Sequence, residues 1–159
     1  MRRAILTVAV SIAALGWGAR ALTAAPTGTT VNLPALTVIQ TREAAFRMQG
    51  AVAAAMKDAV DRKADVKKYA DAAKALADYA AVIPSLFPLG TETGGDTHAL
   101  PKIWSDRAGF EKAAADYRAA AKTLAAKASA GDTEGFAAAF QAMGKTCGAC
   151  HRAFRAKYD

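Results

Sequence analysis

The sequence has little of what would interrupt a helix or build a sheet. Its five prolines are confined to residues 26, 34, 84, 88 and 101, and long stretches between them contain none. β-Branched residues are sparse beside alanine, which is the best helix former. No stretch alternates apolar and polar residues as a half-buried strand does. These absences exclude a substantial sheet and predict an all-α protein.

A concentrated run of basic residues is also missing. The formal net charge is +7, but Arg2, Arg3 and Arg20 lie in an expected leader, and without them 18 basic residues face 14 acidic ones. The remaining charges are spread along the chain. Binding to nucleic acid or to an anionic membrane needs a clustered basic surface. We therefore expect neither partner for the mature protein.

The N-terminus has the layout of a secretory signal. Two arginines precede an apolar run, Ala4–Trp17, and small residues follow it, so that cleavage is expected after Ala21 or Ala24. A retained membrane anchor is the alternative. As a helix the run covers only about 21 Å, less than the roughly 30 Å of a bilayer core. We expect a signal peptide over residues 1–24 and an exported domain over residues 25–159.

Four segments have the spacing of amphipathic helices, near residues 34–61, 65–82, 104–129 and 133–157. In each, apolar residues recur every three or four positions and form one face. Gly131 and Asp132 mark the end of the third segment and the cap of the fourth. Short links make antiparallel neighbours, and the Pro- and Gly-rich stretch between the second and third segments must cross over. The pattern predicts an antiparallel up-down-up-down four-helix bundle with a long middle crossover loop.

Two of these faces carry residues that are unusual for a core. The first includes Arg42 and Gln49, polar groups that are costly to bury without a partner. The fourth passes through Cys147 and Cys150, the only two cysteines in the chain. Whatever the cysteines hold is therefore expected inside the bundle.

Cys147, Cys150 and His151 form a Cys-x-x-Cys-His sequence, which is the attachment signature of c-type haem. Residues three apart lie on one face of a helix, so both sulfurs can bond the two vinyl groups along one porphyrin edge. His151 then supplies an imidazole to the iron as an axial ligand. The sequence predicts one covalently bound haem c.

Other uses of the two thiols fit the sequence less well. A thioredoxin-like redox couple has its first cysteine at a helix N-terminus that follows a strand. A structural zinc ion needs four ligands, and only His98 remains as a fourth beside the two cysteines and His151. A disulfide within one helix has poor geometry. A last alternative is that both cysteines are ordinary structural residues and that the neighbouring histidine is coincidental.

Four stretches resemble the cytochromes c′, the class II c-type cytochromes, in order along most of the mature chain. They read REAAFRMQG, LFPLGTETGGD, IWSDRAGF and CGACHRAFR. The resemblance implies a four-helix haem protein that binds NO or carries electrons in the periplasm, is often a homodimer, and performs no chemical turnover. The redox partner is not implied. Only eight residues follow His151, so we expect no iron ligand downstream of it.

The resemblance also implies roles for further residues. Phe46 is expected over the iron on the face opposite the attaching histidine, and Arg42 at the haem edge, where an arginine can pair with a propionate. Glu43 and Asp96 match positions near that edge. Arg155, four residues after the histidine, is expected one helical turn on, where it can tune the imidazole or simply face solvent near the helix end.

The sixth coordination position of the iron decides the function. Phe46 has no lone pair to donate, and Met48 lies about 200° around the helix from it. Met56 lies about 15 Å further along, while Met143 shares a helix with the attaching histidine. His98 is expected to be a solvated loop residue. We therefore predict five-coordinate high-spin iron under an apolar, donor-free pocket that admits NO and CO.

Two alternatives remain open. One is a six-coordinate low-spin electron carrier of the same fold. The other is an oxidoreductase that uses the two thiols without a cofactor.

Overall fold

A computed structural model describes residues 33–157, all of which belong to one compact unit. The elements are α1 (Ala35–Asp61), η1 (Val66–Tyr69), α2 (Ala70–Val82), η2 (Ile83–Leu86), α3 (Lys102–Ser105), α4 (Arg107–Ala130) and α5 (Thr133–Phe154). In this range the β-type pairing is limited to one isolated bridge. The all-α prediction is confirmed. The expected signal peptide lies outside the described residues.

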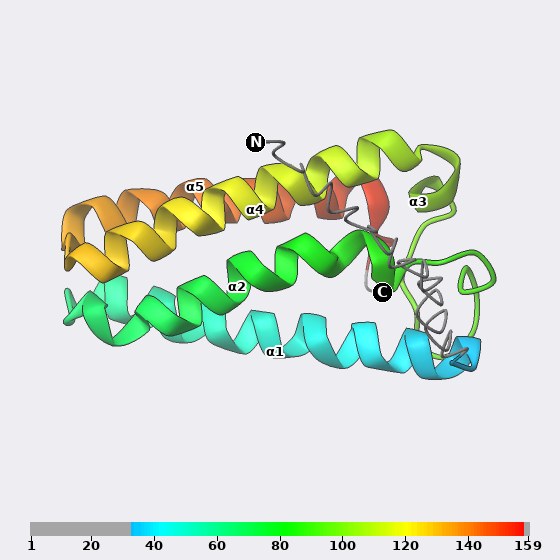
Figure 1. The fold of residues 1–159 in the computed structure, drawn as a ribbon, viewed down its shortest axis with the longest axis horizontal. Helices are drawn as coiled ribbons and strands as arrows, with labels where there is room; N and C mark the ends of the chain where they lie inside the picture. The colour runs from blue at the N-terminus through cyan, green and yellow to red at the C-terminus, as the bar shows by residue number, and fades with distance from the viewer. Residues whose placement is uncertain (1–32, 158–159) are drawn as a thin grey trace, which may run out of the picture. The chain divides into compact units, whose positions relative to one another are not determined.

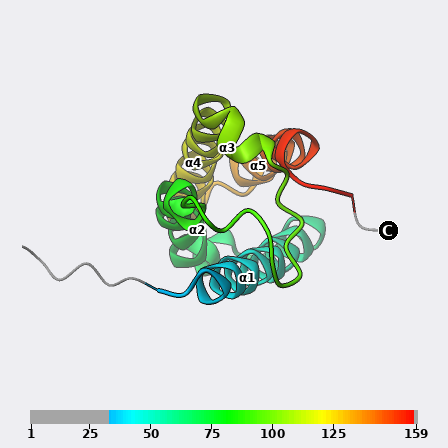
Figure 2. The same cartoon turned by 90° about the vertical axis from the view of Figure 1, so that its right-hand side faces the viewer.

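The four long helices form the bundle that the sequence predicts. Helix α2 runs along α4, and α4 along α5, while α1 approaches α5 and η2 at fewer positions. Viewed from the end, the four helices stand at the corners of the bundle, and the segment between η2 and α3 crosses its end (Figure 2). The long middle crossover therefore separates two antiparallel hairpins (Figure 1).

The turn between α4 and α5 shows how local sequence ends one helix and begins the next. Gly131 adopts a left-handed conformation with φ of 71°, which glycine tolerates without steric cost. The carboxylate of Asp132 then accepts a hydrogen bond from the Gly135 amide at 2.8 Å, the usual N-cap contact. Both assignments made from the sequence are confirmed.

Three helix bounds differ from the expected ones. The second segment begins with the 3₁₀ turn η1. The third is divided into α3 and α4, because Asp106 leaves helical geometry and caps the Gly109 amide at 3.1 Å. The fourth ends at Phe154 rather than at residue 157, because Arg155 is extended.

The segment after α5 pairs with the crossover instead of continuing the helix. Arg155 forms the isolated antiparallel bridge with Ala99. The Leu100 amide donates to the Phe154 carbonyl at 3.0 Å, and the Ala156 amide donates to the His98 carbonyl at 2.8 Å. These backbone bonds fasten the C-terminal residues to the end of the bundle that the crossover covers.

The apolar core lies mainly among α2, α4 and α5. Its buried members on these helices are Ala73, Leu76, Ala77, Ala80, Phe110, Ala114, Tyr117, Ala121, Leu124, Ala128, Phe136, Ala139, Met143 and Phe154. Many are alanines, whose small side chains let the helix backbones approach closely. Among residues 33–157, no helix is long and apolar enough to cross a membrane.

Candidate haem-binding site

Cys147 and Cys150 lie one turn apart on α5, where both are half-buried and packed against the core. Both are free thiols. The expectation that this face of the fourth helix points inward is confirmed. The two sulfurs are thus presented on one side of a long helix to a group inside the bundle.

The surroundings of the thiols do not favour a reactive redox couple. Burial raises the pKa of the Cys147 thiol above its ordinary value. Burial also raises the pKa of Cys150, the charge of Cys147 adds to this, and the charge of Arg155 partly opposes it. Reactive cysteines have a lowered pKa because the thiolate is the nucleophile. Here both thiols are held in the protonated form.

His151 is exposed at the surface of α5, yet enough protein surrounds its ring to affect its titration. Partial desolvation, and then the positive charge of Arg155, lower the pKa of His151 below its ordinary value. A neutral imidazole is the form that ligates a metal. The side chain is therefore available as a ligand at neutral pH.

Arg155 is the residue at which α5 ends. The helix stops at Phe154 and the Arg155 backbone is extended, so the helix does not continue to residue 157. The Arg155 backbone amide still donates to the His151 carbonyl at 3.1 Å, and its charge acts on the imidazole. This backbone bond places Arg155 one turn beyond His151, and the proposed influence of Arg155 on the imidazole stays a prediction.

Phe46 lies on the inward side of α1 within a group of aromatic rings. Its ring meets Tyr79 edge to face, with centroids 5.8 Å apart, and is tilted against Phe87 at 6.2 Å. These contacts favour a defined ring position. The Tyr79 hydroxyl is buried without a hydrogen-bond partner, and an apolar, donor-free pocket under Phe46 stays a prediction.

The three methionines that the structure describes do not offer a ligand at this position. Met48 is 66% exposed and points away from the bundle, as the helical spacing predicts. Met56 and Met143 are 0% and 2% exposed and belong to the apolar core. Each of the three thus occupies surroundings unlike those of Phe46.

His98 is less exposed than the sequence analysis expected. Its side chain is 31% exposed, and its Nε2 lies 4.0 Å from Asp96 Oδ1. The His98 carbonyl accepts a hydrogen bond from the Ala156 amide, so the C-terminal segment lies beside this part of the crossover. Asp96 itself is 89% exposed.

Arg42 is the most deeply buried charged residue described, with 2% of its surface exposed. Its Nη1 donates to Thr91 Oγ1 at 2.9 Å and to the Leu86 carbonyl at 3.4 Å, and its Nη2 donates at 2.8 Å to both the Thr91 carbonyl and Thr97 Oγ1. Desolvation lowers the pKa of Arg42, and the nearby carboxylate charges partly oppose this. The crossover thus supplies the hydrogen-bond partners that a buried Arg42 needs. Pairing of Arg42 with a haem propionate stays a prediction.

The middle of α1 is the least buried part of the helix's inward side. Ile39 and Arg42 are buried near one end and Met56 and Ala59 near the other, with no buried residue from Glu43 to Ala55. Near this stretch, Glu43 Oε1 and the Tyr79 hydroxyl are buried without a hydrogen-bond partner. An unpaired buried polar atom costs about 1–3 kcal/mol. Incomplete burial together with unpaired polar atoms fits a site that a large amphipathic group completes.

Gln49, the other polar residue on this face, is satisfied within the protein. Its Oε1 accepts a hydrogen bond from the Tyr117 hydroxyl of α4 at 2.7 Å. Tyr117 in turn lies close enough to Cys147 for the thiolate charge to contribute to its raised pKa, after the larger effect of burial. The hydrogen bond joins the middle of α1 to α4, at a residue that lies near the cysteine-bearing part of α5.

Comparison with known proteins agrees with this geometry. The family model described as Cytochrome C′ matches residues 37–155. The chain belongs to the cytochrome c′ family. Members of this family carry covalently bound haem c, and in this chain Cys147, Cys150 and His151 provide the attachment sequence.

Individual relatives extend the comparison. A cytochrome c′ from Rhodospirillum rubrum is 41% identical over 87 residues, 55% of this chain and 59% of the relative, so the chain spans about three fifths of its length. A nitric oxide complex of a cytochrome c′ variant from Alcaligenes xylosoxidans matches with 30% identity and a TM-score of 0.71, covering 78% of this chain and 97% of that one. A cytochrome c′ with ligand-controlled dimer dissociation matches with 28% identity and a TM-score of 0.75, covering 80% and 100%.

Proposed function

We propose that this cytochrome c′ family member is an exported periplasmic protein that binds NO or CO at its haem, or carries single electrons, without chemical turnover. Cys147 and Cys150 would hold the haem c covalently, and His151 would be the axial ligand on one side. The iron supplies the gas-binding and redox chemistry. The chain's own contribution is to keep the opposite side apolar and free of a competing ligand.

The position of Phe46 is the observation that carries this proposal. A benzyl side chain packed between Tyr79 and Phe87 occupies the face of α1 where a ligating residue would be needed. It has no electron pair to donate, so the proposed resting iron is five-coordinate and high-spin. A neutral diatomic molecule can enter once the ring moves aside, whereas the bulk of the ring resists larger ligands. Access to this side and its polarity are the protein's means of choosing a ligand.

Two substitutions of Phe46 test the proposal. Phe46→Ala removes the covering ring, so CO association measured by flash photolysis should accelerate by about tenfold or more. Phe46→Met introduces a thioether and should convert the ferric visible spectrum to the six-coordinate low-spin type. Phe140→Ala is the control, because Phe140 is also half-buried but lies on α5, outside the contacts of Phe46. An unchanged CO rate in Phe46→Ala would count against the proposal.

Homodimer formation is part of the same proposal. Its support is the ligand-controlled dimer dissociation described for one structural relative. Sedimentation of the holoprotein with and without CO tests it. A dimer whose dissociation constant rises with CO agrees with the proposal, and a monomer at all concentrations contradicts it.

A further inference from the structure

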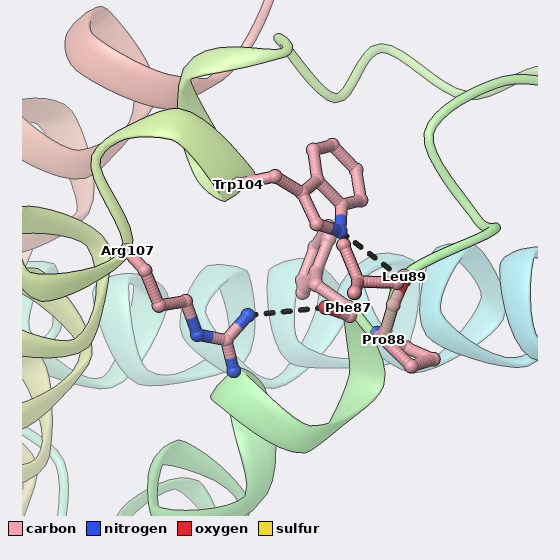
Figure 3. A pocket seen from close by; sticks show the side chains of 5 residues that line it. All are labelled: Phe87, Pro88, Leu89, Trp104 and Arg107. Carbon is pink, nitrogen blue, oxygen red and sulfur yellow. Dashed lines mark hydrogen bonds between the residues drawn. The ribbon is translucent and has the colours of Figure 1, made fainter.

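A cavity of about 310 Å³ opens at the end of the bundle, beneath the crossover. Its lining residues are Phe87, Pro88, Leu89, Trp104 and Arg107 (Figure 3). The first three come from the crossover, Trp104 comes from α3, and Arg107 begins α4. The cavity is thus an open pocket bordered by the crossover, α3 and the first residue of α4.

The polar atoms around this cavity are already paired. Arg107 donates from Nη1 to the Phe87 carbonyl at 3.0 Å and from Nη2 to the Pro84 carbonyl at 2.7 Å. Trp104 Nε1 donates to the Pro88 carbonyl at 3.1 Å, as Figure 3 shows. Ordered water in a cavity needs two to four polar partners. With these carbonyls occupied, the lining offers mainly rings and methyl groups.

An apolar lining of this size suits a small neutral molecule. An apolar cavity of about 150 Å³ is enough to take up xenon or benzene, and this one is larger. Its mouth is marked by Leu89, which is 85% exposed. A charged or strongly hydrogen-bonding ligand would find its partners here already engaged, which favours an apolar diatomic gas over a metabolite or an anion.

Phe87 connects the cavity to the proposed gas-binding side. Its ring is 6% exposed and stands 6.2 Å from the ring of Phe46 and 6.0 Å from that of Trp104, centroid to centroid. The guanidinium of Arg42 lies 4.4 Å from the centroid of the same ring. A single side chain thus lines the cavity and also contacts the residue that is expected to cover the iron.

We propose that this cavity is a docking site for NO or CO on the way to the pocket under Phe46, with Phe87 as the wall between them. The inference rests on the proposed function, because it needs a gas-binding iron on that side. It gives the crossover a role in gas binding that is separate from haem attachment. Gas enters past Leu89, is held by apolar contacts, and passes when Phe87 and Phe46 move together.

Xenon under pressure is the probe for the site. Crystals of the ferric holoprotein should show xenon in the cavity of the wild type and none in Leu89→Trp, whose larger side chain fills the mouth. Leu33→Trp is the matched control, since Leu33 is also an exposed leucine, at 52%, but does not line the cavity. In flash photolysis, CO association should slow by about threefold in Leu89→Trp and remain unchanged in Leu33→Trp.

The outcomes separate the two proposals. An empty cavity in the xenon-treated wild type, or an unchanged CO rate when the indole visibly fills the mouth, overturns the docking site and leaves the proposed function standing. A wild type that takes up xenon but never binds CO overturns the proposed function, and with it the assignment of a gas to the cavity.

Discussion

Helices α1 and α4 are similar in length, at 27 and 24 residues, but they are packed very differently. Helix α4 has a buried residue on every turn of its inward face and is in close contact with both α2 and α5. Helix α1 has buried residues only near its ends, and its middle is half-buried. One helix is part of a continuous core, and the other forms one side of an incompletely filled space.

The composition of the two faces explains this difference. Every turn of α4 presents alanine or a large apolar residue inward, which permits close approach and full burial. The middle of α1 instead presents Glu43 and Gln49, polar groups that are costly to bury, on either side of the half-buried ring of Phe46. The α2–α4–α5 side therefore provides stability, and the α1 side leaves room for a bound group. The predictions below test this division of roles, from the largest expected effect to the smallest.

The first prediction concerns the cysteines, which lie on the inward side of α5. Cys147→Ser combined with Cys150→Ser should abolish covalent haem attachment completely, because no other thiol exists in the chain. Mass spectrometry under denaturing conditions should find only the apoprotein mass. Met48→Ser, at an exposed position on α1, should keep the haem. A haem-containing mass for the double variant would contradict the assignment of the attachment site.

The second prediction compares the α2–α4–α5 side with the α1 side by the same substitution, Phe to Ala, on each. Phe136→Ala removes a fully buried ring from α5 and should lower the free energy of unfolding by about 3–5 kcal/mol. Phe46→Ala removes a half-buried ring and should cost less than half as much. Guanidinium unfolding of both holoproteins measures the difference. Equal losses would mean that the two sides contribute alike and that the comparison is wrong.

The third prediction uses Arg42, which ties α1 to the crossover. Arg42→Leu leaves the carbonyl and hydroxyl oxygens of the crossover without their donor, and should lower the free energy of unfolding by about 3 kcal/mol. Arg62→Leu is the control, because Arg62 is exposed and pairs with Asp58 on the same helix surface. Its loss should be under about 0.5 kcal/mol. If both variants unfold at the same denaturant concentration, the crossover does not depend on Arg42.

The fourth prediction concerns pH. Burial raises the pKa of Tyr79 to about 12, so the folded state keeps the phenol proton that the unfolded chain releases near pH 10. The contribution of Tyr79 to the free energy of unfolding is constant below pH 10. As the pH rises toward 12, the free energy of unfolding falls by about 2 kcal/mol or less for this reason. Tyr79→Phe should therefore lose less stability over that interval than the wild type. Identical alkaline unfolding curves would show that Tyr79 is already solvated.

The helices and the attachment sequence could be predicted from the sequence because both are local patterns. A helical face repeats every three or four residues, and Cys-x-x-Cys-His occupies five consecutive positions. The division between α3 and α4 also had a local signal, since Asp106 is a good N-cap residue. Tyr79 follows Leu76 by three residues and so shares its face, a spacing that could have indicated its place beside Phe46.

The contacts of Arg42 and Arg155 could not be predicted in this way. Arg42 finds its partners in Thr91 and Thr97, roughly fifty residues later in a segment without periodicity. Arg155 leaves the helix because its backbone pairs with Ala99. Both depend on how the crossover folds over the end of the bundle, which is decided by tertiary contacts. Local helix propensity predicts that α5 continues past Phe154. It cannot indicate that Arg155 pairs with the crossover instead of continuing the helix.

The resting coordination of the iron tests the central claim most directly. The visible and EPR spectra of the purified ferric holoprotein at neutral pH report whether the side covered by Phe46 supplies a ligand. The account predicts a haem-containing protein with a high-spin, five-coordinate spectrum. A low-spin spectrum from iron with two axial ligands at rest would contradict it.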